Sequence, residues 1–463
     1  MEKLKTPLIF AAIVLGAAFF LAKVGFTRDQ VMATSIFLII LCGTLFYWPF
    51  RVTFAFAGIG TLLATKLLDV PHIVEFAGLD IILFIVGTMC LIGHLEEKHF
   101  PEYVLAKVTD RIGHRPYLLI AVLMVFSMIS AALVGEVTST LFMMATTFHL
   151  TKRYQVNPVP FLLMIVFATN IGSSATAVGN PIGVMIALRG HLTFSDFLRW
   201  ACPISVIVIT VTILLCFFYF RNEMRHLAKQ MKKERKEESE IAHVHFRKKD
   251  INICWILLLG LVGFLVFHHQ IEEMFGLEKN TLLLGTALFA GAIAIFLNAQ
   301  NARDFFTRRV DWWTLTFFMA LFASVGTLKY TGVTDRIAKE MISMASGNST
   351  LLLVTFTGAI SLLTGFMDNV LAVATFIPIL SDIGKSGIFI YPFWWGMLFG
   401  GTLYGNLTVV GSTANIVAMG MLEKEYKQNI SFMTWLKPGF IVSTITIAIA
   451  LLLIYLQIPL MPH

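Results

Sequence analysis

The stretch Asn170–Pro181, NIGSSATAVGNP, lies inside one of the most apolar parts of the chain. It combines small hydroxyl residues, glycines, asparagines and a proline, which favour a loop over a continuous helix. A second stretch of this kind, GNLTVVGSTAN, occupies positions 405–415. Irregular backbone at membrane depth is tolerated only where it is buried in protein or lines a wet cavity. We therefore interpret the two stretches as paired breaks in transmembrane helices.

Close helix packing through small residues is the alternative explanation of these breaks. It accounts for the glycines and alanines but leaves four amide side chains without a reason: Asn170, Asn180, Asn406 and Asn415. Buried amides need hydrogen-bond partners in an apolar setting. A binding role is therefore the better interpretation of the two stretches.

The composition around the breaks is that of a polytopic membrane protein. Of 463 residues, 57% are hydrophobic and 14% are charged, whereas a soluble domain carries about 25% charged residues. Apolar runs of transmembrane length recur along the chain. The predicted spans are approximately 7–26, 31–50, 53–70, 80–96, 117–134, 158–168, 202–221, 253–269, 281–298, 312–329, 350–366, 391–403 and 436–457.

Two compositional features narrow the class of protein further. Residues 1–26 pair early lysines with a long apolar run, but no small-residue cleavage site follows, so we expect a retained first helix. The five cysteines all lie in apolar segments without CxxC spacing, which predicts neither a disulfide framework nor a zinc site.

The chain carries an internal duplication. Asp368 lies 232 positions after Glu136 (368 − 136), Thr408 lies 232 after Thr176 (408 − 176), and the same offset separates Gly179 from Gly411. One offset that matches three unusual residues indicates a repeat. The segments SAALVGEVTST at 130–140 and LLTGFMDNVLAVAT at 362–375 then correspond, and both suit re-entrant hairpins with an acidic tip.

An acidic residue in an apolar run is expensive and is kept for a cation, a proton or a basic partner. A carboxylate that exchanges Na⁺ for H⁺ would provide antiport directly, because a bound cation offsets the effect of burial on protonation. A hidden salt bridge is the alternative, and Lys329 is the nearest candidate base in the sequence.

The polar block between Arg221 and Asp250 is rich in lysine and arginine, and we expect it in the cytoplasm by the positive-inside rule. It divides the chain. The predicted organisation is N-terminal transmembrane helices at 1–52, transport repeat 1 at 53–222, a charged cytoplasmic linker at 223–252, a connecting transmembrane helix at 253–281 and transport repeat 2 at 282–463.

At the breaks and hairpins the chain resembles the ion transporter superfamily, in particular the ArsB/NhaD permease branch, which is related to arsenite-efflux, NhaD sodium/proton antiporter, P protein and citrate/dicarboxylate transporter families. The resemblance covers roughly 53–222 and 282–458. The family's first break often reads NIGGTATLIGDPPN, so Asn180 stands here for its aspartate and Gly183 for its asparagine. Its hairpins often carry Asp-Asn, which matches Asp368-Asn369 but not Gly135-Glu136.

The resemblance implies an all-α polytopic membrane protein of two inverted repeats, each with a re-entrant hairpin and a broken transmembrane helix. It also implies a substrate site between the repeats, a homodimer and an elevator-like movement. The location implied is the bacterial inner membrane.

The residues and the resemblance together predict a secondary active ion transporter, with sodium/proton antiport as the main expectation. Transport of arsenite, antimonite, a carboxylate or an oxyanion, coupled to sodium or protons, is the alternative. A channel is a further alternative, which only coupling to an ion gradient would separate. We expect no enzyme, since no HExxH, GxGD or nucleophile elbow occurs.

The expected partners are a small inorganic ion or small anion and the lipid bilayer, without nucleic acid and with no cofactor beyond bound sodium at Glu136 and Asp368. The predicted binding residues lie in the hairpin tips and the breaks: Glu136, Thr138, Asn170, Ser173, Ser174, Thr176, Asn180, Asp368, Asn369, Asn406, Thr408, Ser412, Thr413 and Asn415.

Overall fold

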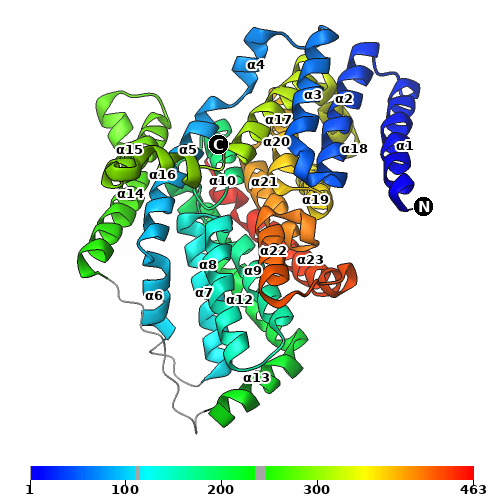
Figure 1. The fold of residues 1–463 in the computed structure, drawn as a ribbon. Coiled ribbons are helices and arrows are strands. Elements are labelled where there is room, and N and C mark those ends of the chain that lie inside the picture. The colour runs from blue at the N-terminus through cyan, green and yellow to red at the C-terminus, as the bar shows by residue number, and fades with distance from the viewer. Residues whose placement is uncertain (1, 110–114, 235–246, 463) are drawn as a thin grey trace. The chain divides into compact units, whose positions relative to one another are not determined.

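The apolar runs form helices, and every regular element in the described part of the chain is helical. The computed structural model describes residues 2–109, 115–234 and 247–462. Seven of the described helices are long and apolar enough to cross a membrane, or eight if the bent pair Thr281–Leu297 and Ala299–Arg309 counts as one span. The prediction of an all-α polytopic membrane protein is confirmed (Figure 1).

The chain folds into two compact units that interleave along the sequence. The first comprises Met1–Leu83, Val310–Thr355 and Ala374–Ile390, and the second comprises Phe84–Arg309, Phe356–Val373 and Tyr391–His463. The units therefore do not follow the sequence halves, and the boundaries drawn from the repeats stay a prediction.

The first unit is assembled around one apolar helix. Its helices are α1 (Glu2–Lys23), α2 (Arg28–Phe46), α3 (Arg51–Ala64), α4 (Val70–Phe76), α17 (Trp312–Tyr330) and α18 (Val333–Met344). Helix α17 packs against α2, α3 and α4. Arg51 is buried and donates to the Thr314 hydroxyl at 2.6 Å. Lys329 is exposed near the end of α17, so it is not the buried base that a hidden salt bridge would need.

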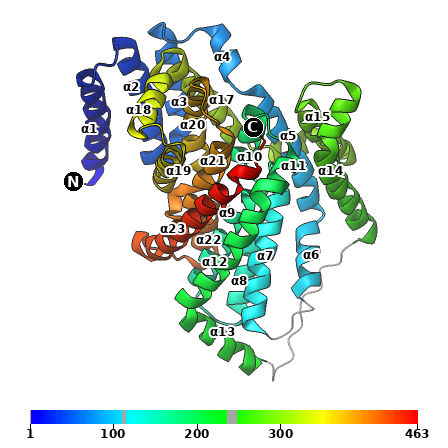
Figure 2. The same cartoon turned by 180° about the vertical axis from the view of Figure 1, so that it is seen from behind.

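The second unit holds the hairpin tips and both breaks. Its longer helices are α5 (Leu79–Glu97, from Phe84 on), α6 (Phe100–Thr109), α7 (Pro116–Val134), α8 (Glu136–Arg153), α9 (Pro158–Ser173), α10 (Pro181–Arg189), α12 (Cys202–Tyr219), α13 (Arg221–Glu234), α14 (Lys248–Phe275), α15 (Thr281–Leu297), α16 (Ala302–Arg309), α21 (Tyr391–Leu403), α22 (Thr413–Tyr426) and α23 (Phe432–Gln457). Helices α7, α9 and α12 pack side by side (Figure 2).

Short elements complete both units. They are α11 (Phe194–Asp196), the π-helical turn Phe197–Ala201, and the 3₁₀ turns Trp48–Phe50, Ala299–Asn301, Tyr404–Asn406, Val409–Gly411 and Ile458–Leu460. Helices α19 (Ser349–Phe366) and α20 (Asn369–Lys385) have residues in both units, and their facing ends belong to the second.

Each predicted hairpin is a pair of helices with an acidic residue at the turn. Between α7 and α8 the chain turns at Gly135, whose φ of +88° favours glycine. The backbone N–H of Glu136 then donates to the carbonyl of Gly179 in the first break at 3.0 Å. In the second hairpin, Met367 and Asp368 lie between α19 and α20. The inverted orientation of the two repeats stays a prediction.

The breaks are shorter than the sequence suggested. Helix α9 continues through Ser173, so only Ser174–Asn180 is irregular, and α22 already begins at Thr413. Side-chain caps explain where the second halves start. The Asn180 side chain accepts from the Gly183 N–H at 2.8 Å, and the Ser412 hydroxyl accepts from the Ala414 N–H at 3.1 Å. Pro181 stands at the first helical position.

The basic linker is partly helical, which the sequence interpretation did not anticipate. Helix α13 extends to Glu234 and α14 starts at Lys248, while residues 235–246 lie outside the described part of the chain. Met224, Leu227 and Met231 are buried on one face of α13. They are spaced three and four positions apart, as on one face of an amphipathic helix. This pattern indicates a helix, but it is hard to see in a block with so many charged residues.

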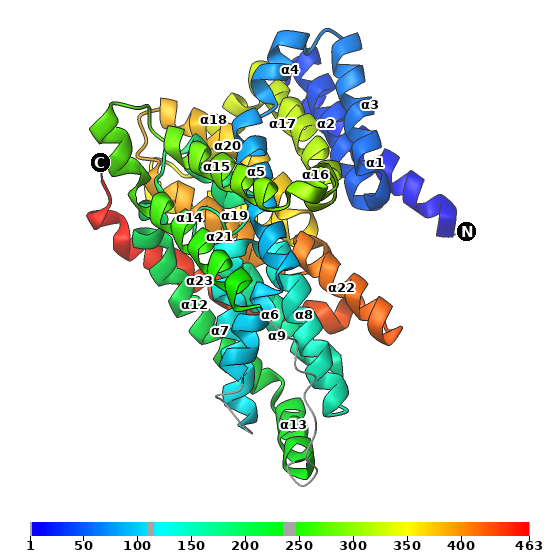
Figure 3. The same ribbon diagram turned by 60° about the vertical axis from the view of Figure 1, so that its left-hand side comes forward.

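At Gly87, helix α5 comes close to the backbone of α15, and Figure 3 shows the two helices side by side. A Cβ atom on Gly87 would lie 2.3 Å from the carbonyl oxygen of Ala287, which is backbone and cannot rotate away.

We expect Gly87→Ala to destabilise the protein by roughly 1–3 kcal/mol through overpacking. The loss of stability is measured by thermal unfolding in detergent. Gly285→Ala, in the same helix α15, has open space around its Cβ and should unfold like the wild type. Equal unfolding of both variants would contradict this packing.

Candidate ion-binding site at the hairpin tips

The two acidic residues converge in one buried cluster. Glu136 is 3% exposed and Asp368 is 4% exposed, and they interact electrostatically. Polar side chains from both repeats also interact with the Glu136 carboxyl group, namely Ser173, Asn180 and Asn369. We call these five residues and Thr413 the hairpin-tip cluster. Residues from segments 232 positions apart (368 − 136) therefore share one small polar volume.

Both carboxyl groups are held at the start of a helix, where backbone N–H groups favour negative charge. Asp368 accepts from the Val370 N–H at 3.0 Å and from the Thr413 hydroxyl at 2.9 Å. Glu136 is the first residue of α8, and its Oε2 atom has no hydrogen-bond partner among the described residues. A buried carboxyl oxygen without a partner is costly unless a ligand or proton satisfies it.

The asparagines of the breaks form a second cluster, the asparagine core, made of Asn170, Asn406, Ser412 and Asn415. Asn170 Nδ2 donates to the side-chain oxygens of Asn406 at 2.7 Å and Asn415 at 2.9 Å. Its own oxygen accepts from the Ser412 hydroxyl at 3.1 Å. All four residues are at most 1% exposed. Because these amides satisfy one another, the asparagine core joins the two breaks.

Ser173 connects the two clusters. Its hydroxyl donates to the backbone carbonyl of Asn170 at 2.9 Å and accepts from Asn180 Nδ2 at 2.8 Å. Asn180 in turn caps α10 through its oxygen. The position where the family often has aspartate is thus occupied by an amide that both donates and accepts here.

The threonines at the repeat offset tie each break to its own hairpin. Thr176 donates to the carbonyl of Ala132 in α7, and Thr408 donates to the carbonyl of Gly365 in α19 at 2.7 Å. Both acceptors lie in the last turn of the first hairpin helix, where carbonyls lack helical partners. The two repeats share this contact, which supports the duplication.

Two of the sequence-predicted residues point elsewhere. The Ser174 hydroxyl donates to Ile171 and contacts the Ser205 hydroxyl of α12 at 2.9 Å. Thr138 interacts with the carboxyl group of Glu96 at the end of α5. The structure therefore brings Glu136, Ser173, Asn180, Asp368, Asn369 and Thr413 together and places the other eight candidates in supporting contacts.

Sequence reasoning missed the polar residues at the end of α5. Arg309 Nη1 lies 2.9 Å from Glu96 Oε2, and Arg309 Nη2 lies 3.3 Å from Glu97 Oε1. The aliphatic part of the arginine passes over Gly93, where a Cβ would clash with it. The adjacent charged residues in HLEEK, at the end of an otherwise apolar run, are the feature of the sequence that could have indicated this group of polar residues.

The chemistry of the hairpin-tip cluster suits a hard cation. Carboxylate, amide and hydroxyl oxygens are the ligands that such ions prefer. Within the described residues no group of three or more histidine, cysteine or acidic side chains could hold a metal ion. The cluster therefore offers oxygen ligands to a hard cation and carboxyl groups to a proton.

Comparison with known proteins agrees with this fold. The family model CitMHS, described as citrate transporter, matches residues 36–400 and 325–462. The 46 kDa membrane protein of Mycobacterium leprae is 31% identical over 82% of this chain and 86% of its own length. The human P protein is 26% identical over 80% of this chain and 52% of its own length.

Two solved structures share the fold. The YdaH transporter of Alcanivorax borkumensis superposes with a TM-score of 0.59 at 13% identity, over 87% of this chain and 89% of that one. MtrF of Neisseria gonorrhoeae, described among antimetabolite efflux pumps, superposes with a TM-score of 0.52 at 11% identity, over 86% and 84%. At these identities the likeness concerns the fold alone.

Proposed function

Because the chain belongs to the citrate transporter family CitMHS, we propose that it exchanges sodium for protons at the hairpin-tip cluster. The chain is an integral secondary membrane transporter of this family, and the resemblance to the ion transporter superfamily is confirmed. The proposal includes sodium and protons as the exchanged ions, an elevator-like movement as the transport mechanism, and a homodimer as the oligomeric state.

One observation carries the proposal. Two buried carboxyl groups, one from each repeat, interact electrostatically, and Glu136 Oε2 has no partner in the described part of the chain. Two negative charges in one buried site repel each other strongly. A sodium ion or a proton relieves that repulsion, so the two ligands compete for the same site. Competition between them at one alternately exposed site is the thermodynamic basis of antiport.

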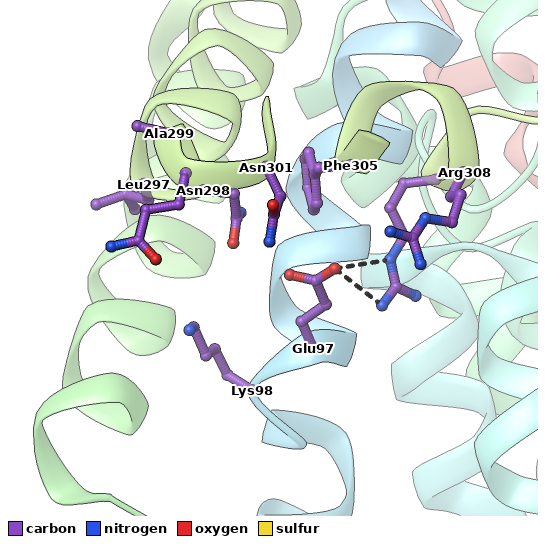
Figure 4. A pocket seen from close by; sticks show the side chains of 10 residues that line it. Glu97, Lys98, Leu297, Asn298, Ala299, Asn301, Phe305 and Arg308 are labelled. Carbon is purple, nitrogen blue, oxygen red and sulfur yellow. Dashed lines mark hydrogen bonds and ion pairs between the residues drawn. The ribbon is translucent and has the colours of Figure 1, made fainter. Parts of the chain in front are cut away.

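Carboxylate transport is the second candidate, and the family name and a cationic cluster favour it. Lys98, Arg308 and Arg309 lie around one cavity beside the end of α5 (Figure 4). In this second candidate function, the carboxylate is the transported substrate and the hairpin-tip cluster binds the coupling cation.

Proteoliposomes with an internal pH dye and an imposed inward proton gradient test the proposal. Na⁺, Li⁺, K⁺, arsenite, citrate and sulfate are added one at a time. Dissipation by Na⁺ or Li⁺ is the expected result. A response to citrate or arsenite, without a response to any cation alone, would replace antiport by the second candidate.

Glu136→Gln separates a transport role of this residue from a structural one. The variant keeps the shape but cannot carry charge, so we expect sodium-dependent proton flux to fall about tenfold or more. Thermal stability should stay equal or rise, because a buried charge is removed. Flux and melting temperature are measured on the same preparation. Glu425→Gln, which alters an exposed ion pair with Lys152, is the matched control. Retained flux with lost stability would assign Glu136 to the fold.

A further inference from the structure

Helix α13 carries its positive charges on one side. The helix has five basic and two acidic residues, a formal net charge of +3 (5 − 2). With 3.6 residues per turn, the basic residues fall within an arc of about 120°, and both glutamates lie outside that arc. We call these exposed basic residues the basic flank: Arg221, Arg225, Lys229, Lys232 and Lys233.

The rest of the described chain does not neutralise the basic flank. None of its five side chains forms an ion pair with another described residue. Glu223 lies on a different side of the helix, where it lines a small recess with Val156 and Asn157 of the turn between α8 and α9. The basic flank therefore keeps its charge and is open to a negatively charged partner.

The basic flank begins on the lipid-facing side of the preceding span. The segment Phe194–Tyr219, which ends with α12, is long and apolar enough to cross a membrane. Phe218 in its last turn is 74% exposed, and a large apolar side chain so exposed on a membrane span faces lipid. The Arg221 guanidinium group lies 6.0 Å from the centroid of the Phe218 ring. The basic flank therefore starts where the lipid-facing surface of α12 ends.

The opposite side of α13 holds the helix against the ends of the spans. Its buried residues Met224, Leu227 and Met231 lie on that side. Helix α13 packs against α7 as well as α12, and it runs in a different direction from α12 (Figure 2). Tyr117, in the first turn of α7, packs edge to face against Phe217 at 5.4 Å. Such aromatic side chains gather at membrane–water interfaces, so α13 lies close to the level of the lipid head groups.

We propose that the basic flank of α13 binds the head groups of anionic lipids in the cytoplasmic leaflet. The positive-inside rule places this polar block on the cytoplasmic side. The cytoplasmic leaflet has a negative surface potential, and each lysine or arginine close to it adds to the attraction. Fourteen residues of helix spread the five charges over about 21 Å, which suits more than one head group. The surface is independent of the proposed ion exchange, because it shares no residue with the hairpin-tip cluster.

Native mass spectrometry of the full chain in a neutral detergent tests the proposal. The probe is phosphatidylglycerol, and phosphatidylcholine is the reference without net charge. We expect the wild type to bind phosphatidylglycerol roughly tenfold more tightly than phosphatidylcholine. The triple variant Arg225→Gln/Lys229→Gln/Lys233→Gln should lose most of that preference. The triple variant Arg225→Lys/Lys229→Arg/Lys233→Arg keeps the charges and should keep the preference.

The charge-matched control is Lys66→Gln/Lys279→Gln/Lys339→Gln, which removes three exposed lysines from other segments. It should bind phosphatidylglycerol like the wild type. All the substituted residues are exposed, so the melting temperatures should change little.

Three results would overturn the proposal. The first is a wild type without preference for phosphatidylglycerol, or with a preference that the glutamine variant of the basic flank retains. The second is an equal loss of preference in the charge-matched control, because the overall charge alone would then explain the binding. The third is displacement of phosphatidylglycerol by excess glycerol phosphate, which would assign the basic flank to a soluble anion.

Discussion

Replacement of Asp368 by asparagine is expected to abolish sodium-dependent proton movement while the protein stays folded. The amide has nearly the same shape, and its oxygen can still accept from the Val370 N–H that caps α20. The negative charge is lost, however, and with it the attraction for a cation in a buried setting, where such attraction is strong. We expect flux to fall by roughly tenfold or more, equivalent to at least about 1.4 kcal/mol of cation binding.

The measurement is proton flux in proteoliposomes under an imposed gradient, with and without Na⁺, alongside a melting curve in detergent. Asp335→Asn is the matched control. That residue pairs with Lys339 on the surface of α18, with half of its side chain exposed, so the substitution should leave flux unchanged. Wild-type sodium response in Asp368→Asn, with normal folding, would remove Asp368 from the ion pathway.

Asn170→Ala is expected to cause the largest loss of stability. The substitution deprives three buried groups of a partner: the side-chain oxygens of Asn406 and Asn415 and the hydroxyl of Ser412. Each buried group left without a partner costs about 1–3 kcal/mol, so the total is roughly 3 kcal/mol or more. Because these bonds join the two breaks, we also expect transport to be lost with the fold.

Thermal unfolding in detergent gives the stability, and Asn222→Ala provides the matched control. Asn222 is exposed at the start of α13, so its truncation should change the melting temperature little. If Asn170→Ala melts like the wild type but loses transport, the asparagine core is part of the ligand site instead of a structural junction.

Much of the architecture follows from local patterns in the chain. Long apolar runs determine helices that cross a membrane, because backbone polar groups in lipid can be satisfied only within a helix. Proline and glycine in NIGSSATAVGNP and its partner determine that those helices are interrupted. The shared offset of Glu136/Asp368 and Thr176/Thr408 indicated a duplication, and the matching contacts of Thr176 and Thr408 support it.

Predictions from local sequence patterns were less accurate at helix ends and in charged segments. Ser173 and Thr413 lie in helices because caps, and not composition alone, decide where a helix stops. In α13 the buried methionines and leucine were masked by a high density of charge. Both errors arise because a window of sequence reports average polarity, while packing responds to which face each residue occupies.

Composition and local patterns were enough to predict a helical membrane transporter with two broken segments and an acidic residue near each. Which of the fourteen candidate residues meet depends on how the helices pack in three dimensions. This packing grouped Glu136 with Asp368 and Asn369, turned the asparagines of the breaks toward one another, and directed Thr138 to Glu96. It also brought Lys98 and Arg308 to one cavity from segments about two hundred positions apart (308 − 98 = 210). Hydrogen bonds and ion pairs form only between groups that lie within a few ångströms of each other in space. The number of residues between two groups in the sequence does not give that spatial distance.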